Sequence, residues 1–160
     1  MMYGSLQVPP TARSAVDAAF AYLRRDGVER TLIDRLERAP EDCRIAVNRR
    51  GNDSYDPNAH VIHWDPTSAL RTTTGGRQSP ALGLGHEIDH AVEAIYRPAT
   101  SDRLSASFDA AYDDKEERRV ITGSETHAAR TLGEDTRRDH AGSLYRVSGP
   151  ALRRAGVLAA

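Results

Sequence analysis

The sequence predicts a single α+β domain in which several helices pack beside a small antiparallel sheet. Three observations support this: apolar residues recur at helical spacing in several segments, they alternate with polar residues between residues 43 and 64, and 160 residues suit one hydrophobic core. Residues 1–10, which contain two adjacent prolines, are expected to form an irregular leader. Residues 11–160 are expected to form the domain.

Two helices are expected at the start of this domain. The first covers 15–23, where apolar residues follow the helical period, and Gly27 is expected to end it as a C-cap. The second covers 28–39, because Pro40 disfavours helical geometry in the residue before it.

Strands are expected next, followed by a loop. Apolar and polar residues alternate over 43–48 and recur over 55–64, and a turn-rich segment at 50–53 separates them. This pattern predicts a small antiparallel sheet. Residues 65–80 are rich in Thr, Gly, Ser and Arg and show no period, so we expect a mobile loop there.

The strongest helical pattern covers 80–96, where a proline suits the first turn. Residues 97–115 show no clear preference. A further helix is expected over 124–132, with its first serine as N-cap and Gly133 as its stop. The Arg-rich tail from 134 onward is only weakly patterned.

Composition excludes several function classes. The chain has 22 Lys and Arg against 23 Asp and Glu, and this net charge of −1 gives no electrostatic case for a nucleic-acid or membrane partner. No apolar stretch approaches the roughly 18 residues of a membrane helix, and the first residues lack the pattern of a secretory signal. The single cysteine, Cys43, cannot form an internal disulfide and is expected in the core. No heptad pattern is present, so we expect a monomer.

The segment that carries chemistry is His86-Glu87-Ile88-Asp89-His90, an H-E-x-x-H match on the helix expected at 80–96. Residues i and i+4 of a helix differ by about 40° in direction, so His86 and His90 can bind one Zn²⁺ together. Glu87 lies at the edge of the same face, where a general base is needed. An apolar stripe on the opposite side is expected to anchor the helix; it consists of Leu84, Ile88, Ala91, Val92 and Ile95.

A catalytic zinc site needs a third protein ligand. One known class of zinc peptidases continues the motif with Gly and His, but Glu93 and Tyr96 stand at those positions here, so that class is excluded. A carboxylate from another helix is the natural candidate. A role outside the ligand shell is expected for Glu93, one turn beyond His90. The candidate third ligands are Glu116, Glu117 and Glu125, with Asp113, Asp114 and His127 also possible.

Several of these segments together resemble the M91 family of zinc metallopeptidases. The resemblance is carried by residues 53–57, 61–66 and 79–91, and it continues through the acidic segment 116–123 and the helix 125–133. It covers about residues 53–140. The chain departs from the family pattern at Thr126, where Asn is usual, and at His140, where Tyr is usual.

The resemblance implies a zincin-like fold with one catalytic zinc. Members of this family are bacterial effector proteases, some of which cleave mitogen-activated protein kinases. The resemblance therefore implies a protein made in the bacterial cytoplasm, translocated into a host cell and directed at a host signalling protein.

With the motif and the resemblance combined, we assign the zinc ligands to His86, His90 and Glu117 and the general base to Glu87. The oxyanion role of the family tyrosine is assigned to His140 or Tyr145. Arg137 could form a local salt bridge or contact substrate. Two alternatives remain open: a non-catalytic zincin-like interaction module, and a zinc peptidase whose third ligand is an aspartate.

Overall fold

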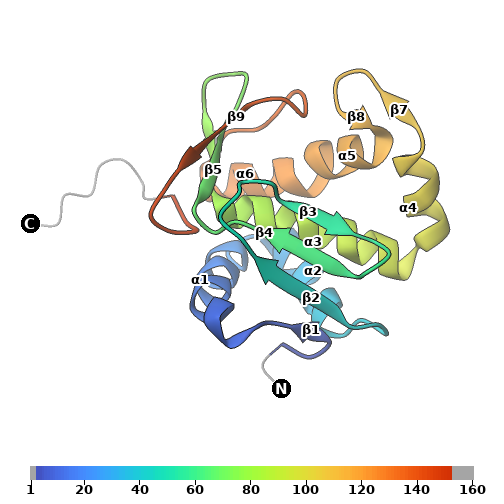
Figure 1. Cartoon of the computed structure of the whole chain (residues 1–160). Coiled ribbons are helices and arrows are strands. Elements are labelled where there is room, and N and C mark those ends of the chain that lie inside the picture. The colour runs from blue at the N-terminus through green and yellow to red at the C-terminus, as the bar shows by residue number, and fades with distance from the viewer. Residues whose placement is uncertain (1–2, 153–160) are drawn as a thin grey trace, which may run out of the picture.

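A four-stranded mixed sheet forms the front layer of the protein (Figure 1). The computed structural model describes residues 3–152. β1 pairs with β2 and β2 pairs with β4 in parallel, and only β3 runs antiparallel to its neighbour β4. The expectation of an antiparallel sheet is therefore wrong, because alternation predicts a strand but not its direction. In the order β1, β2, β4, β3, the strands span Leu6–Gln7, Cys43–Val47, Val61–Trp64 and Ser54–Asp56.

Residues 3–10, which fall in the expected irregular leader, pack against the rest of the domain. β1 lies within them and extends the sheet, and Leu6 is only 3% exposed to solvent. Pro10–Ala12 then form a short 3₁₀ turn that leads into the first α-helix. Backbone pairing and burial both fix this segment to the rest of the chain.

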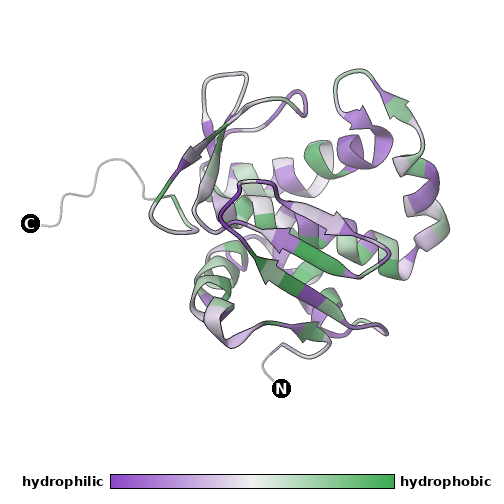
Figure 2. Ribbon diagram, viewed as in Figure 1, coloured by the Kyte–Doolittle hydropathy of each residue, from purple (hydrophilic) through white to green (hydrophobic). Residues whose placement is uncertain are grey.

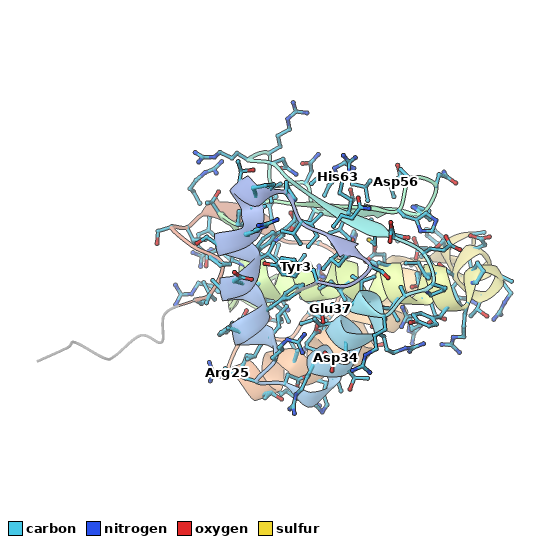
Figure 3. All side chains as sticks on the ribbon, turned by 90° about the horizontal axis from the view of Figure 1, so that it is seen from below. Tyr3, Arg25, Asp34, Glu37, Asp56 and His63 are labelled. Atoms are coloured by element: carbon cyan, nitrogen blue, oxygen red, sulfur yellow. The ribbon has the colours of Figure 1, made fainter. Side chains whose placement is uncertain are left out.

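Three helices lie behind the sheet, namely α1 (Arg13–Leu23), α2 (Gly27–Glu37) and α3 (Pro80–Tyr96). Seen from below in Figure 3, His63 and Asp56 lie on the sheet side of α3, and Asp34 and Glu37 lie on α2 on its other side.

Gly27 begins α2 and does not end α1, contrary to the sequence expectation. The carboxylate of Asp26 caps α2 by accepting hydrogen bonds from the backbone N–H groups of Val28 and Glu29, both at 3.0 Å.

The helix predicted over 80–96 is confirmed as α3. The hydroxyl of Ser79 accepts a hydrogen bond from the Leu82 N–H, and Pro80 occupies the first turn. The indole N–H of Trp64 donates to the Pro80 carbonyl at 2.8 Å and fixes the start of the helix to the sheet. Figure 2 shows apolar residues concentrated on α3 and on the strands in front of it. The predicted apolar stripe is buried throughout, but the opposite face, which carries His86 and Glu87, is also largely covered.

A second sheet has the order β6, β5, β9 and forms from segments that were expected to be irregular. β5 (Ser68–Arg71) and β6 (Arg77–Gln78) lie in the predicted loop, and β9 (Ser143–Arg146) lies in the tail. β9 pairs antiparallel with β5. The expected mobile loop is therefore a strand pair held in place by the end of the described chain.

The remaining elements run from residue 98 to 132. The helix expected over 124–132 begins at Thr126, and the Ser124 hydroxyl donates to Asp89 instead of capping it. Gly133 ends this helix in the left-handed region, at φ 73°, as predicted. These elements are α4 (Pro98–Ser105), β7 (Phe108–Asp109), β8 (Asp113–Asp114), α5 (Lys115–Val120), a π-helix (Ile121–Glu125) and α6 (Thr126–Leu132).

The core contains the single cysteine, as expected. Cys43 is a buried free thiol and Trp64 is fully buried. None of the helices between residues 3 and 152 is both long and apolar enough to cross a bilayer.

Candidate metal centre

Three predicted ligands lie together at the middle of α3. The Nε2 atoms of His86 and His90 are 3.0 Å apart. Glu117 places Oε2 at 3.0 Å from Nε2 of His86 and Oε1 at 3.1 Å from Nε2 of His90. This cluster has the composition and spacing to hold a metal ion.

Local structure explains why these side chains meet. His86 and His90 are one helical turn apart on α3. Glu117 lies in the first turn of α5, which begins where the Asp114 carboxylate accepts the Glu117 N–H at 2.8 Å. α5 packs across α3, so the glutamate reaches the histidine pair from the facing helix.

Each imidazole is also held at its far nitrogen by a second carboxylate. Nδ1 of His86 lies 2.7 Å from Oε2 of Glu125, and Nδ1 of His90 lies 3.2 Å from Oε1 of Glu116. An ionised carboxylate only accepts, so each Nδ1 carries a proton, and the neutral form of each histidine presents its Nε2 lone pair to the centre. The two alternative ligands, Glu116 and Glu125, therefore lie behind the histidines and not in the ligand cluster.

An arginine in turn holds each of these outer carboxylates. Arg137 donates to Glu125 through Nε at 2.8 Å and Nη2 at 2.6 Å. Arg119 donates to Glu116 through Nε at 2.9 Å and Nη2 at 2.7 Å. The site thus contains two parallel His–Glu–Arg chains, and both guanidinium groups bind their carboxylate with two nitrogens.

The π-helix allows both outer glutamates to face α3. Gly123 departs from helical geometry there, with φ −103° and ψ −105°. The resulting kink lets Glu116, before it, and Glu125, after it, reach different histidines of the same helix. Such π-helical insertions occur frequently at functional sites.

The pKa shifts show that the centre attracts positive charge. Burial alone would lower the pKa of His90, but hydrogen bonds with Glu116 and Glu117 raise it to about 9. His86 behaves likewise: burial opposes its charge, and Glu117 and Glu125 raise its pKa well above the usual value. Burial would raise the pKa of Glu117, yet the two histidines hold it well below its ordinary range.

These observations fit a bound cation. Oε2 of Glu117 is buried and lies close to His86, but it has no hydrogen-bond partner of acceptable geometry among the described residues. The two Nε2 atoms, 3.0 Å apart, repel one another in the neutral form unless a positive charge, from a proton or a metal ion, lies beside them. A metal ion would satisfy all three groups together.

Two further carboxyl groups lie beside the cluster. Glu87 is 7% exposed, and its pKa is raised by burial, against the charges of His86 and His90. Asp53 lies just before β3, and its Oδ1 accepts the Asp65 N–H at 2.8 Å. Burial raises the pKa of Asp53 to about 7, and the charge of Glu87 adds to this shift.

His140 reaches the centre, whereas Tyr145 does not line it. Nε2 of His140 is 3.5 Å from Oε2 of Glu117, and its Nδ1 is hydrogen-bonded to Asp113. Tyr145 lies on β9 opposite Ala69, with the Arg71 guanidinium 5.5 Å from its ring. Of the two residues expected to replace the family tyrosine, only His140 is positioned at the site.

The other residues considered as ligands or neighbours of the metal have different contacts. Asp113 binds His140, Asp114 caps α5, and neither belongs to the ligand cluster. His127 pairs with Asp26 at 2.7 Å on the other side of the core. Glu93 is buried and pairs with Arg97 at 2.9 Å, so it contacts neither histidine.

Two pockets, each of about 320 Å³, meet at this centre. We call them the sheet-side pocket, lined by residues of β5, β6 and β9, and the helix-side pocket, lined by residues of α4 and α5. Asp53, Glu87 and His140 line both. β3 is an edge strand. Asp53, just before it, lines both pockets, and Ser54 and Tyr55 line the helix-side pocket. The arrangement provides a groove with a free strand edge, two hollows and a metal cluster between them.

Sequence reasoning did not identify several residues at the site. Asp53 and Gln78 had no local signal, because a single Asp before a strand and a single Gln are common. The role of Arg137 was left open, and the contact that decides it joins residues 12 positions apart, on either side of α6. We compared the chain with protein-family models, curated proteins and solved structures, and nothing matches it.

Proposed function

We propose that this protein is a zinc-dependent endopeptidase. The observation that carries the proposal is the cluster of His86, His90 and Glu117 with Glu87 beside it. Two imidazoles and one carboxylate are a ligand set of catalytic zinc, which leaves a further position open. Tetrahedral zinc with bonds of about 2.0–2.1 Å needs ligand atoms about 3.3 Å apart, close to the 3.0–3.1 Å separations found here.

Bound zinc would acidify a water molecule and polarise the carbonyl of the peptide to be cleaved. Glu87 takes the proton of the attacking water and passes it to the leaving amine. Its buried position at the junction of the two pockets suits a group that first accepts and then donates a proton. His140 donates a hydrogen bond to the carbonyl oxygen as negative charge develops there, with Asp113 fixing its ring.

The groove accounts for a polypeptide substrate. The unpaired edge of β3 offers backbone groups to an extended chain, which would cross the metal centre between the two pockets. The resemblance to the M91 family extends the proposal to a zincin-like effector that is translocated into a host cell and cleaves a host signalling protein such as a mitogen-activated protein kinase.

A non-catalytic interaction module is the competing function. A zinc site that only supports structure or binding has no need of a buried carboxylate beside the cluster. The position of Glu87 at the junction of the two pockets therefore favours catalysis.

The test combines metal content with cleavage of a peptide library. We expect one zinc per chain by mass spectrometry in the wild type and in Glu87→Gln, and no zinc in His90→Ala. Only the wild type should cleave the library, and its activity should exceed that of Glu87→Gln by at least about 100-fold. Zinc binding without any cleavage by the wild type would favour the interaction module. Absence of zinc after metal is added would refute the peptidase and favour the interaction module.

A further inference from the structure

The two pockets differ in chemical character. The helix-side pocket is lined by Asp114, Glu116 and Glu117. The sheet-side pocket shares Asp53, Glu87 and His140 with it. Arg137 and Glu125 form an ion pair in the sheet-side pocket, and Leu70 and Leu144 also line it. What distinguishes the two pockets is therefore a pair of leucines on the sheet side and three further carboxyl groups on the helix side.

A cross-strand row forms the wall of the sheet-side pocket. Leu70 on β5 stands opposite Gln78 on β6 and opposite Leu144 on β9. Residues in register on neighbouring strands project to the same face of a sheet, and all three line the pocket. The neighbouring pair, Ala69 and Tyr145, projects to the other face.

Leu144 is unusually exposed for a residue in such a row. It remains 55% exposed, although it stands beside Leu70 in a concave site. An exposed apolar side chain that lines a pocket next to a candidate active site is a feature of binding surfaces.

Two glycines keep this pocket open. A Cβ at Gly51, which has φ +67°, would lie 2.9 Å from Oγ of Ser68 and 3.0 Å from Cδ1 of Leu144. A Cβ at Gly142, which has φ +146°, would lie 2.8 Å from Cδ1 of Leu70. Larger residues would strain the backbone and push into the leucine row.

The cross-strand row of Leu70, Gln78 and Leu144 is also linked to the metal centre, through Gln78. Nε2 of Gln78 donates to Oε1 of Glu125 at 2.9 Å, and Glu125 holds His86. The pocket shares Glu87 and His140 with the centre. When the peptide bond to be cleaved lies at the cluster, the substrate side chain on one side of that bond would lie against this wall.

We propose that the sheet-side pocket binds an apolar side chain of the substrate next to the scissile peptide bond, and that Leu70 and Leu144 determine this specificity. The inference rests on the proposed peptidase function. It commits the substrate to a residue such as Leu, Met or Phe on that side of the bond.

The main test is a cleavage-site profile on a diverse peptide library, using zinc-loaded protein and mass spectrometry. The wild type should prefer Leu, Met or Phe at one position adjoining the cut. Leu144→Thr, which retains strand preference, should lower kcat/KM for the preferred peptides at least about tenfold and flatten the profile. Val47→Thr is the matched control, because Val47 is also an exposed strand residue, at 40%, and does not line either pocket.

Binding is measured separately so that the two proposals can fail independently. In zinc-loaded Glu87→Gln protein, N-acetyl-leucine amide should shift the NMR methyl signals of Leu70 and Leu144, and N-acetyl-glutamine amide should not. Cleavage without an apolar preference, or with a preference that Leu144→Thr leaves intact, overturns the specificity assignment but leaves the peptidase. If the leucine probe shifts the methyl signals but the wild type cleaves no peptide, the pocket assignment is supported and the peptidase proposal is overturned. If the probe shifts neither methyl signal, the pocket assignment is overturned.

Discussion

Glu29 shows how a single buried residue can make stability depend on pH. It lies on α2 with 0% exposure, and neither carboxylate oxygen has a partner among the described residues. Burial raises its pKa to about 8, and the charges of Asp89 and Asp26 contribute. Its pKa in the unfolded chain is about 4.3. The folded protein therefore favours the protonated form, and the stability present at low pH is progressively lost as the pH rises from about 4 to about 8.

Replacing Glu29 by Gln should remove this dependence. In metal-free protein we expect the free energy of unfolding of the wild type to fall, relative to Glu29→Gln, between pH 5 and pH 8. Each unit of pKa shift corresponds to about 1.4 kcal/mol, so the difference should reach a few kcal/mol. Urea unfolding at several pH values measures it. Parallel pH curves for the two proteins would contradict the role of Glu29.

The outer carboxylates predict a second effect at the scale of one residue. Glu125→Gln retains the size of the side chain but weakens the hydrogen bond to His86 and the pairing with Arg137. Zinc affinity should fall about 10- to 100-fold, as measured by competition with a chelating dye. Glu93→Gln is the control. Glu93 is a buried carboxylate on the face of α3 that carries His86 and His90, but it pairs with Arg97. Equal affinities for the two variants would argue against the His–Glu–Arg chains.

At the scale of the element, Asp26 joins two helices. Its Oδ1 caps α2, and its Oδ2 accepts hydrogen bonds from His127 and Thr131 of α6, each at 2.7 Å. Removing a fully buried carboxylate with four partners leaves donors unsatisfied. Asp26→Ala should lower the free energy of unfolding by about 2–4 kcal/mol in denaturant titrations.

A surface ion pair provides the matched comparison. Asp34 on α2 pairs with Arg24 at 2.7 Å, and its side chain is 38% exposed. Asp34→Ala should cost no more than about 1 kcal/mol, because solvent screens exposed pairs. Similar losses for Asp26→Ala and Asp34→Ala would mean that Asp26 does not couple α2 to α6.

The elements also show what the sequence can and cannot predict. α3 was predictable because its period, its Ser79 cap and its Pro80 are all local signals. The direction of β2 against β4 was not, because it depends on pairing between distant segments. β5 and β9 were missed for the same reason: polar residues such as Ser68 and Arg71 give no strand period, and the partners lie more than 70 residues apart.

The site residues also divide into those that a local motif predicts and those whose roles depend on contacts between distant segments. His86, Glu87 and His90 follow from one motif on one helix. Glu117 was chosen over Glu116 and Glu125 with the help of a resemblance, because three glutamates near helix starts look alike in sequence. Their separate roles depend on the kink at Gly123, which places each carboxylate against a different atom of the histidines.

At the scale of the whole molecule, a bound metal should stabilise the fold by linking α3 to α5. Free zinc at 1,000 times its dissociation constant contributes about 4 kcal/mol, which corresponds to an increase in Tm of roughly 10 °C for a domain of this size. Chelation should reverse this increase in differential scanning fluorimetry. Glu117→Gln should show a much smaller zinc-dependent change in Tm. An unchanged Tm on adding zinc to the wild type would contradict a site between the two helices.

The pairing of β9 with β5 has a consequence for the order in which the protein assembles during synthesis. The histidine pair and Glu117 have left the ribosome's catalytic centre well before Ser143–Arg146 are made, and at about 5–20 residues per second this interval lasts one to several seconds. All three cluster residues are therefore part of the nascent chain before Leu144 is added. The wall of the sheet-side pocket is completed only when β9 pairs with β5, so a chain interrupted before residue 143 would keep the residues of the candidate metal cluster but lack that wall.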